Sequence, residues 1–161
     1  MLASIRQAEP ADAEAIAAIY NQGIEERQAT FETRPRSDKD ILEWLAGAFP
    51  VAVALDDGGR VLAFASSSAY SSRSCYSHIA DFSVYTSREA RRQGAGKAAL
   101  LELIRLAREA GLRKLTSKVF VENGASRAML KQLGFHEIGV HERHGMLDGQ
   151  WHDVVVVELL L

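Results

Sequence analysis

Two glycines and three basic residues gather in one short segment, Arg91-Arg92-Gln93-Gly94-Ala95-Gly96-Lys97, immediately before a stretch with helical periodicity. Glycines at this spacing let the backbone approach a ligand closely, and the first turn of a helix presents unpaired N–H groups. Such N–H groups next to positive side chains suit an anion. The segment therefore predicts a site for a pyrophosphate.

Other interpretations of this segment differ in how well they fit. A plain helix start with solvated basic side chains remains open. A P-loop needs G-x-x-x-x-G-K-[ST], but Arg91 stands five residues before Gly96, and Ala98 follows Lys97. A dinucleotide-binding fold needs a third glycine after its first strand, but Ala99 stands there and several predicted strands come earlier.

Hydrophobic periodicity predicts the elements that must position this segment. We expect strands over residues 4–8, 51–55, 61–65, 79–85, 115–120, 135–140 and 154–160. Helices are expected over residues 10–23, from Ser37 to Phe49, over 97–110 and over 126–133, with Gly23 as the end of the first. This order predicts an α/β fold, with a central mixed sheet (α+β type) flanked by helices on both faces.

Length and composition limit the class of protein. The 161 residues fit one domain, 1–161, and the net charge of −2 gives no sign of nucleic-acid or membrane binding. Cys75, the one cysteine, can form neither an intrachain disulfide nor a thiolate zinc site. No apolar run approaches a membrane span, and the first residues lack the apolar region of a signal peptide. We expect a soluble, cytoplasmic protein.

The glycine segment resembles the Q/R-x-x-G-x-G/A motif of the GNAT N-acetyltransferases, which holds the pyrophosphate of acetyl-CoA. Asn123-Gly124-Ala125-Ser126, followed by Gly134-Phe135 after a short helix, is similar to the downstream pattern of this family. The predicted order of strands and helices matches as well. The resemblance implies acetyl-CoA as co-substrate and no metal.

Further segments resemble the phosphinothricin acetyltransferase branch, which includes enzymes acting on methionine sulfoximine and arsinothricin. The matching segments are Thr30-Phe31 through Pro35, Arg73-Ser74-Cys75-Tyr76, Ser83-Val84-Tyr85 (with Thr86 in place of a valine) and Gly149-Gln150-Trp151-His152-Asp153. Each is weak alone, and together they are specific.

The resemblance implies roles for individual residues. Backbone groups of Val84 and Thr86 would pair with the acetyl carbonyl and pantetheine, and Tyr85 would be a further cofactor-binding residue. The pyrophosphate would be held by Arg91, Arg92, Gln93, Gly94, Ala95, Gly96 and Lys97, and the CoA arm by Asn123 and Ser126. Phe31, Arg73 and Tyr76 would form the acceptor pocket. There the guanidinium of Arg73 would grip an amino-acid carboxylate, a pairing that suits its planar fork.

Asp81 is the candidate catalytic base. The branch carries a glutamate three residues before the Val-Tyr pair, and here that position holds the shorter Asp81. Asp81 could instead make a structural hydrogen bond, and His78 is an alternative base. Many relatives carry a tyrosine or histidine seven residues after the asparagine, whereas this chain has Leu130, so no general acid is assigned.

Several other residues invite chemistry without a supporting motif. His136, His141, His144 and His152 lack metal-ligand spacing, and His141 and His144 are expected in the loop between the last two strands. Trp151 is expected to pack at a strand start, and His152 could face the pocket or a partner. Cys75, a conceivable acetyl acceptor, is expected to be a passive side chain.

The sequence therefore favours an acetyl-CoA-dependent N-acetyltransferase that acts by direct transfer on the amino group of a small amino acid or an amino-acid-like toxin. Alternatives are an acetyltransferase for polyamines, aminoglycosides or protein N-termini, and a non-catalytic acyl-CoA-binding protein. The expected partner is a small amine acceptor, and a homodimer is expected, with the apolar last strand near its interface.

Overall fold

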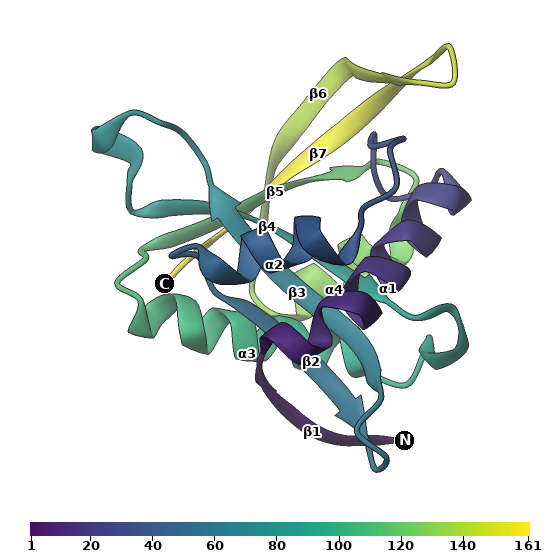
Figure 1. Ribbon diagram of the computed structural model, residues 1–161. Coiled ribbons are helices and arrows are strands. Elements are labelled where there is room, and N and C mark those ends of the chain that lie inside the picture. The colour runs from purple at the N-terminus through teal and green to yellow at the C-terminus, as the bar shows by residue number, and fades with distance from the viewer.

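Seven strands form a single mixed sheet in the order β1-β2-β3-β4-β5-β7-β6, in a computed structural model that describes residues 1–161 (Figure 1). All neighbouring strands are antiparallel except β4 and β5, which are parallel. The strands are β1 (Leu2–Gln7), β2 (Val51–Asp56), β3 (Val61–Ala69), β4 (Ile79–Thr86), β5 (Lys114–Phe120), β6 (His136–Leu147) and β7 (Gln150–Leu160).

Four helices cover the two faces of the sheet, which confirms the predicted architecture and element order. They are α1 (Ala13–Glu26), α2 (Asp38–Ala46), α3 (Ala95–Glu109) and α4 (Gly124–Gln132). The core clusters show that α1 and α2 pack on one face and that α3 and α4 pack on the other. Short 3-10 turns lie at Pro10–Asp12, Ser74–Tyr76 and Arg88–Ala90.

The helix starts follow local capping chemistry. The Ser37 side chain accepts from the Asp40 N–H at 3.3 Å, and the Asp40 carboxylate accepts from the Ser37 N–H at 2.9 Å. This reciprocal pair is a capping box, as the predicted helix start at Ser37 requires. Asn123 caps α4, because its Oδ1 accepts from the Ser126 N–H at 3.3 Å.

The prediction that the first helix ends at Gly23 is wrong. Helix α1 continues to Glu26, and Arg27 follows in the left-handed conformation with φ 57°. A Cβ at Gly23 would lie 2.9 Å from Cδ1 of Tyr85, so glycine is needed there for close packing of α1 on β4. Here the glycine marks a contact inside the helix, and Ile24 continues the buried face.

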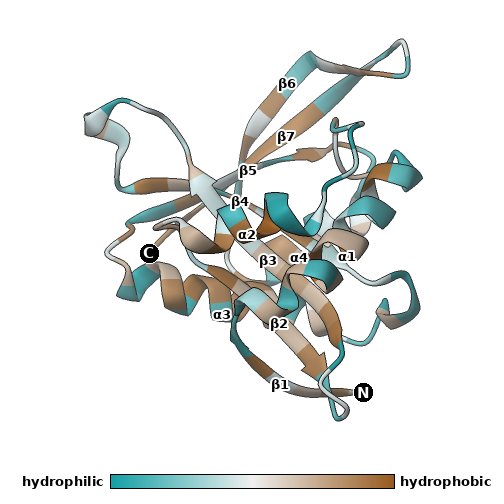
Figure 2. Cartoon of the chain, viewed as in Figure 1, coloured by the Kyte–Doolittle hydropathy of each residue, from teal (hydrophilic) through white to brown (hydrophobic).

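Two hydrophobic clusters hold the layers together. The larger joins α3 and α4 to the sheet and includes Leu62, Leu100, Leu103 and Leu115; the smaller joins α1 and α2 to the opposite face. Residues 51–55 of β2 and 61–65 of β3 are buried without interruption, because both faces of these strands are covered. Figure 2 shows the resulting apolar stretches on the central strands and on α3.

The sheet opens between β4 and β5. These strands pair at only three positions, of which Asp81 with Thr116 is the last. β3 remains paired with β4 as far as Thr86, and β7 remains paired with β5 as far as Phe120. Each half of the sheet therefore stays intact while the two halves diverge, which leaves one edge of β4 without a partner strand.

The last two strands form a long hairpin that extends beyond the body of the molecule (Figure 1). The expectation of a loop around His141 and His144 is wrong, because both residues lie within β6, at an irregularity in its pairing with β7. β7 lies inside the sheet between β5 and β6, and Val154, Val155 and Val157 are buried. This burial excludes those valines from a subunit interface.

Candidate functional site

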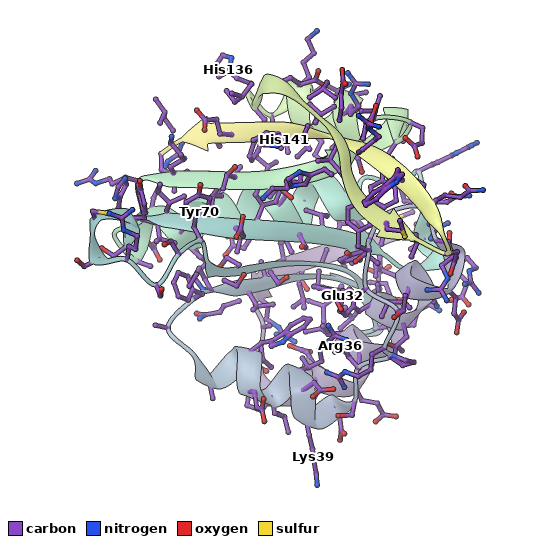
Figure 3. The ribbon with its side chains drawn as sticks, turned by 90° about the horizontal axis from the view of Figure 1, so that it is seen from above. Glu32, Arg36, Lys39, Tyr70, His136 and His141 are labelled. Atoms are coloured by element: carbon purple, nitrogen blue, oxygen red, sulfur yellow. The ribbon has the colours of Figure 1, made fainter.

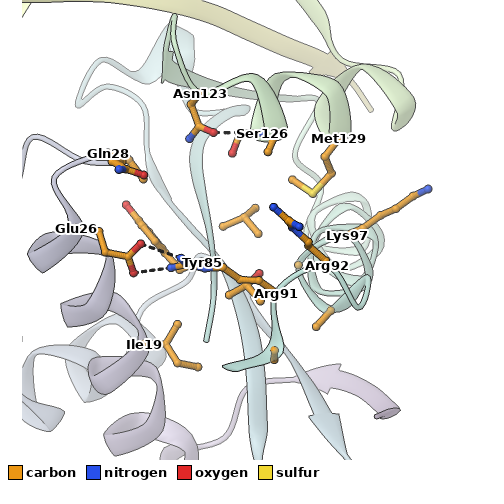
Figure 4. Close-up of a pocket in the computed structure, with 18 of the residues that line it drawn as sticks. Ile19, Glu26, Gln28, Tyr85, Arg91, Arg92, Lys97, Asn123, Ser126 and Met129 are labelled. Atoms are coloured by element: carbon orange, nitrogen blue, oxygen red, sulfur yellow. Dashed lines mark hydrogen bonds and ion pairs between the residues drawn. The ribbon is translucent and has the colours of Figure 1, made fainter. Parts of the chain in front are cut away.

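A cleft of about 890 Å³ lies where β4 and β5 diverge (Figure 4). Its lining comes from four regions that are far apart in the sequence: the end of α1, the end of β4, the glycine segment with the start of α3, and the start of α4. The lining residues that the sequence predicted are Val84, Tyr85, Thr86, Arg91, Arg92, Gly94, Ala95, Gly96, Lys97, Asn123 and Ser126.

The open edge of β4 presents the backbone of Val84 and Thr86 to this cleft. The Ser87 N–H donates to Leu62 O at 2.7 Å on β3, whereas His78 O accepts from the Arg113 N–H at 2.8 Å on the β5 side. Backbone groups alternate sides along a strand, so the even-numbered residues of β4 face β5. Beyond Asp81 no β5 residue pairs with them, so Val84 and Thr86 face the cleft with polar backbone groups.

The start of α3 forms the second wall. Gly94 precedes the helix with φ 80°, and a Cβ at Gly96 would lie 2.6 Å from Oγ1 of Thr86. Gly96 therefore lets the helix lie directly against β4. The N–H groups of Ala95, Gly96 and Lys97 have no hydrogen-bond partner within the chain, as expected for the first turn of a helix. Together they form a positive cradle of the kind that binds phosphate.

The basic residues of this segment have different environments. Arg91 makes a bidentate ion pair with Glu26 of α1, at 2.8 and 2.6 Å, and Glu26 also pairs with Arg88. These guanidinium groups hold the pKa of Glu26 below its ordinary value, although burial opposes them. Arg92 and Lys97 line the cleft without an acidic partner.

Gln93 is exposed and does not line the cleft, in contrast to its predicted place there. Gln93 lies in the turn before α3. The residues that follow it, at the start of α3, border the cleft with their backbone N–H groups. Further lining residues that were not predicted come from α1 and the turn after it, among them Glu26, Arg27 and Gln28. The apolar spacing from Ile16 through Tyr20 to Ile24 could have shown that the helix continues past Gly23 to bring them there.

A second group of candidate residues lies on the side of the sheet that carries α1 and α2. Side chains alternate along strands, and Tyr85 packs with the α1–α2 core whereas Phe82 packs with the α3 core. Asp81 and Ser83 therefore point to the α1–α2 side of β4. On β5 and β7 the same side carries Lys118, Phe120 and His152. We call this surface the acceptor face: Asp81, Ser83, Lys118, Phe120, His152 and the adjacent Phe31.

Asp81 lies half-buried on this face, next to the point of divergence. It makes no hydrogen bond or ion pair within the chain, so the alternative role as a structural hydrogen-bond acceptor has no partner here. Burial raises the pKa of the Asp81 carboxyl above its ordinary value, and the positive charge of Lys118 offsets part of that rise. A carboxylate with a raised pKa and no partner can accept a proton.

Phe31 reaches the acceptor face from the loop between α1 and α2. Its ring lies 4.7 Å from the ring of Phe120 and 6.1 Å from that of His152. It also covers Gly145 of β6, where a Cβ would lie 2.6 Å from Cε1 of Phe31. The hairpin and the α1–α2 loop therefore meet over one end of this face, and the ion pair of Arg27 with Asp148 at 3.3 Å ties them together.

Arg73 and Tyr76 lie elsewhere. Both are exposed on the loop between β3 and β4, where the Arg73 guanidinium lies 5.5 Å over the Tyr76 ring, and neither lines the cleft. In Figure 3, Tyr70, where this loop begins, lies away from Glu32, the neighbour of Phe31. Within one chain the structure thus brings Phe31, but not Arg73 or Tyr76, to the acceptor face, where its ring contacts Phe120 and His152.

The remaining candidate groups are placed as follows. His78 is exposed at the start of β4, at the end of the strand away from the cleft. Cys75 is a free, exposed thiol. Leu130 is buried in the larger core cluster. Trp151 stands near the start of β7 but is 58% exposed, so the expectation that it packs there is wrong.

No group of three His, Cys, Asp or Glu side chains is arranged to hold a metal ion, and no helix is long and apolar enough to span a membrane.

A mixed sheet that splits between two parallel strands, with a glycine-rich helix start beside the split, defines a class of acyl-group transferases. Residues 16–135 match the Acetyltransferase (GNAT) family, and the chain belongs to that family. It is therefore an acetyltransferase, and the predicted fold and family are confirmed.

Within the family, the chain is similar to enzymes of the predicted branch. L-Methionine sulfoximine/L-methionine sulfone acetyltransferase of Pseudomonas aeruginosa is 31% identical over 175 residues, covering 100% of this chain and 96% of that protein. A GNAT superfamily phosphinothricin acetyltransferase from Sinorhizobium meliloti, solved in complex with acetyl-CoA, has a TM-score of 0.91 at 32% identity, covering 100% of this chain and 89% of that one.

Another similar structure is named for a different acceptor, the alanine of a ribosomal protein. Ribosomal-protein-alanine N-acetyltransferase from Brucella melitensis has a TM-score of 0.93 at 32% identity, covering 99% of this chain and 100% of that chain. The co-substrate predicted from the sequence, acetyl-CoA, is the donor of this family. The nature of the acceptor is the open question.

Proposed function

We propose that this enzyme transfers the acetyl group of acetyl-CoA directly to the amino group of a small amino acid or amino-acid-like toxin of the phosphinothricin, methionine sulfoximine or arsinothricin type. The observation that carries the proposal is the acceptor face, on which a carboxylate and an ammonium group, Asp81 and Lys118, stand without ion-pair partners beside the open edge of β4. A zwitterionic amino acid offers the complementary pair of charges. The similarity to the Pseudomonas and Sinorhizobium enzymes supports the same acceptor class.

The charges along the cleft support the proposal that acetyl-CoA binds there. The free amides of Ala95, Gly96 and Lys97 suit the pyrophosphate, together with the unpaired side chains of Arg92 and Lys97. Arg91 is paired with Glu26, so we propose that it fixes the loop and leaves the phosphate contacts to its neighbours. Gln93 would contribute through the turn it belongs to.

Asn123 and Ser126 are proposed to hold the CoA arm. The Asn123 oxygen caps α4, so its amide NH₂ is the group left to donate to a ligand. Val84 and Thr86 stay the proposed contacts for the acetyl end, because their N–H groups face the cleft. The backbone groups of Tyr85 face β3, so its proposed contact is made by the part of the residue that lines the cleft. When bound, acetyl-CoA supplies a thioester carbonyl, and a fixed N–H donor polarises it at little reorganisation cost.

We propose that Asp81 accepts a proton from the attacking nitrogen, directly or through a water molecule. The raised pKa of Asp81 makes its carboxylate a better proton acceptor than an exposed aspartate. Because the side chain is only half-buried, a water molecule can relay the proton to it. Leu130 cannot donate a proton and is buried, so the sulfur leaves as thiolate and is protonated from solvent.

The test is an acceptor screen by thiol release. Phosphinothricin, methionine sulfoximine and methionine sulfone are compared with their α-carboxamides, which keep the amine but lose the carboxylate. We expect turnover of at least one free amino acid and a loss of 10-fold or more in kcat/KM for its amide. No turnover of any α-amino acid would refute the acceptor class.

The carboxylate partner is tested in the same screen. Lys118→Met and Arg73→Ala are compared, since Lys118 lies on the acceptor face and Arg73 was predicted for this role. If Lys118 holds the carboxylate, its substitution raises KM for the amino acid and leaves KM for acetyl-CoA unchanged. Loss of discrimination between acid and amide only in the Arg73 variant would return this role to Arg73 and Tyr76.

A second candidate function is acetylation of a protein N-terminus, which the similarity to the Brucella enzyme favours. An alanine-initiated peptide would then replace the free amino acid as the better substrate. Including such a peptide in the screen, with spermidine and an aminoglycoside beside it, separates these acceptors. A peptide kcat/KM above that of every free amino acid would favour this candidate.

Three wider proposals follow from the predicted branch: a cytoplasmic location, a homodimer, and a role in resistance to amino-acid-like toxins. The dimer is supported by Met146 and Trp151, which face each other across the hairpin and are 51% and 58% exposed. Light scattering of the wild type and of Trp151→Ser tests it. Survival of phosphinothricin-treated cells expressing the chain, and fractionation of those cells, test the other two.

A further inference from the structure

A histidine and a carboxylate form a pair at the rim of the cleft that the proposed reaction leaves unused. Nδ1 of His152 lies 3.1 Å from Oε1 of Glu122. The imidazole is stacked on Phe120, with centroids 4.9 Å apart and planes 20° apart, and Phe31 meets its edge. The His152 side chain is 19% exposed, so the ring is held in place but reaches solvent.

The carboxylate determines which ring nitrogen can act as a base. An ionised glutamate only accepts hydrogen bonds, so the contact with Glu122 requires a proton on Nδ1. In neutral imidazole the proton-free nitrogen is then Nε2, which has no hydrogen-bond partner within the chain. The pair thus resembles in logic the carboxylate–histidine pairs that orient a general base.

The location of the pair joins the two parts of the site. Glu122 lines the cofactor cleft, whereas His152 and Phe120 belong to the acceptor face. The alternation of side chains that places Phe120 on this face also places Asp81 there, at the other end of the open edge. An amine approaching the open edge of β4 therefore passes between Asp81 and His152.

The reaction releases more protons than Asp81 alone accounts for. An amino acid arrives as an ammonium ion; a C–N bond forms, the C–S bond breaks with its electron pair going to sulfur, and nitrogen ends as an amide N–H. Nitrogen loses two protons, sulfur takes up one from solvent, and the balance is one proton released. A first acceptor is therefore needed to produce the free amine, and a second during attack.

We propose that His152 is a catalytic residue, whose Nε2 removes the first proton from the acceptor's ammonium group while Glu122 fixes its tautomer. The partly exposed ring then passes this proton to solvent, and Asp81 takes the second. This inference rests on the proposed acetyl transfer to an ammonium-bearing acceptor, and it holds for an amino acid or a peptide N-terminus alike.

Other charged groups border His152 and enter the interpretation of its pH dependence. Lys118 comes from β5, Glu122 from the turn after β5, and Asp81 from β4. His141 and His144 come from β6, where their rings lie 4.5 Å apart. His141 pairs with Val154, two residues from His152. His141→Asn is therefore a matched control that removes a nearby titrating ring outside the proposed machinery.

The test compares His152→Asn, His152→Phe, His152→Ala and Glu122→Gln with the wild type, using whichever amine the wild type acetylates best. For His152→Asn we expect kcat/KM for the amine to fall about 100-fold at pH 7.5, within the range for a lost proton acceptor. The deficit should shrink about 10-fold per pH unit above that, as free amine replaces ammonium. His152→Phe keeps the stacking but should be equally impaired, and added imidazole should partly rescue His152→Ala.

Two readouts do not depend on turnover. Binding of acetyl-CoA by calorimetry should stay within 2-fold of wild type in the His152 variants, because His152 does not line the cofactor cleft, and this separates the inference from damage to that cleft. In the free protein, ¹⁵N shifts of the His152 ring should show a protonated Nδ1 and a bare Nε2 at pH 8, and Glu122→Gln should redistribute them. If His152→Phe acetylated the amine as fast as the wild type, the proposal would be overturned. A neutral His152 ring with its proton on Nε2 would overturn it as well. Absence of turnover of any amine by the wild type would overturn the proposed function and this inference together, whereas a peptide-only enzyme would leave the inference standing.

Discussion

Substitution of Gly96 by alanine tests whether close contact between α3 and β4 builds the cofactor cradle. The new Cβ would lie 2.6 Å from Oγ1 of Thr86, and ordinary contact begins at 3.4 Å, so the two groups must separate by about 0.8 Å, the difference between these distances. Both the helix start and the strand are anchored in the core, so either response displaces a wall of the cleft. Overpacking of this kind costs about 1–3 kcal/mol.

We expect Gly96→Ala to lower the free energy of unfolding by that amount in urea titrations. We also expect it to weaken binding of CoA, measured by calorimetry, by roughly 10-fold, which corresponds to about 1.4 kcal/mol. CoA is used in place of acetyl-CoA so that binding is measured without chemistry. The expected loss arises because the amides of the first turn no longer point at the position that Thr86 and Val84 define.

Two controls isolate the clash. In Gly139→Ala, on β6 and outside the cleft, the added Cβ meets nothing within 4 Å, so CoA binding and stability should be nearly unchanged. In the double variant Thr86→Ala/Gly96→Ala the clashing hydroxyl is absent, and at least half of the lost binding free energy should return. Normal CoA binding by Gly96→Ala, or no recovery in the double variant, would refute the close-contact explanation of the cradle.

Three further variants probe the acceptor face and the core. Asp81→Asn should lower kcat by 100-fold or more, measured by thiol release, and leave the CoA affinity measured by calorimetry unchanged. Because burial raises the pKa of Asp81, folding favours its neutral form. The thermal stability of Asp81→Asn at pH 7 should therefore equal or exceed that of the wild type. Gly145→Ala should push Phe31 off β6 and raise KM for the amine several-fold without changing KM for acetyl-CoA. Asp12→Asn should cost about 1–3 kcal/mol in urea titrations at pH 7, because buried Asp12 accepts from Arg6 at 2.7 and 3.1 Å. These bonds lower the pKa of Asp12 against the effect of burial, so the stabilisation is present above its unfolded pKa near ~3.9 and should disappear as pH falls through the lower folded value.

Most helices and strands could be predicted from the sequence because burial and helix capping depend on residues close together in the chain. The stripe on α3 and the uninterrupted apolar runs of β2 and β3 report burial directly, and Ser37 with Asp40 reports a cap. The exceptions are positions where a distant contact overrides the local meaning of a residue. Glycine often ends a helix, but Gly23 lies inside α1, where only a residue without a Cβ leaves room for the Tyr85 ring of β4.

The cofactor side of the site was predictable for the same reason, since its residues are consecutive and act through the backbone. The acceptor face was less so, because it is assembled from loop, β4, β5 and β7 by the pairing register. Arg73 and Phe31 belong to equally suggestive motifs, but only Phe31 is carried to this face by the fold. Motif resemblance alone could not separate the two.

The divergence of β4 and β5 explains why unpaired backbone groups lie beside the unpaired carboxylate of Asp81. Strand pairing normally satisfies both edges of a central strand, and here it stops after Asp81. That single interruption exposes the Val84 and Thr86 backbone to the cofactor and leaves Asp81 half-buried without a partner. Most other charged groups near the cleft are paired, as Arg91 is with Glu26 and His152 with Glu122. Four charged groups remain without ion-pair partners: Arg92 and Lys97 beside the proposed pyrophosphate position, and Asp81 and Lys118 on the acceptor face. An incoming zwitterion would complete the second pair, so we expect the acceptor to order these two side chains.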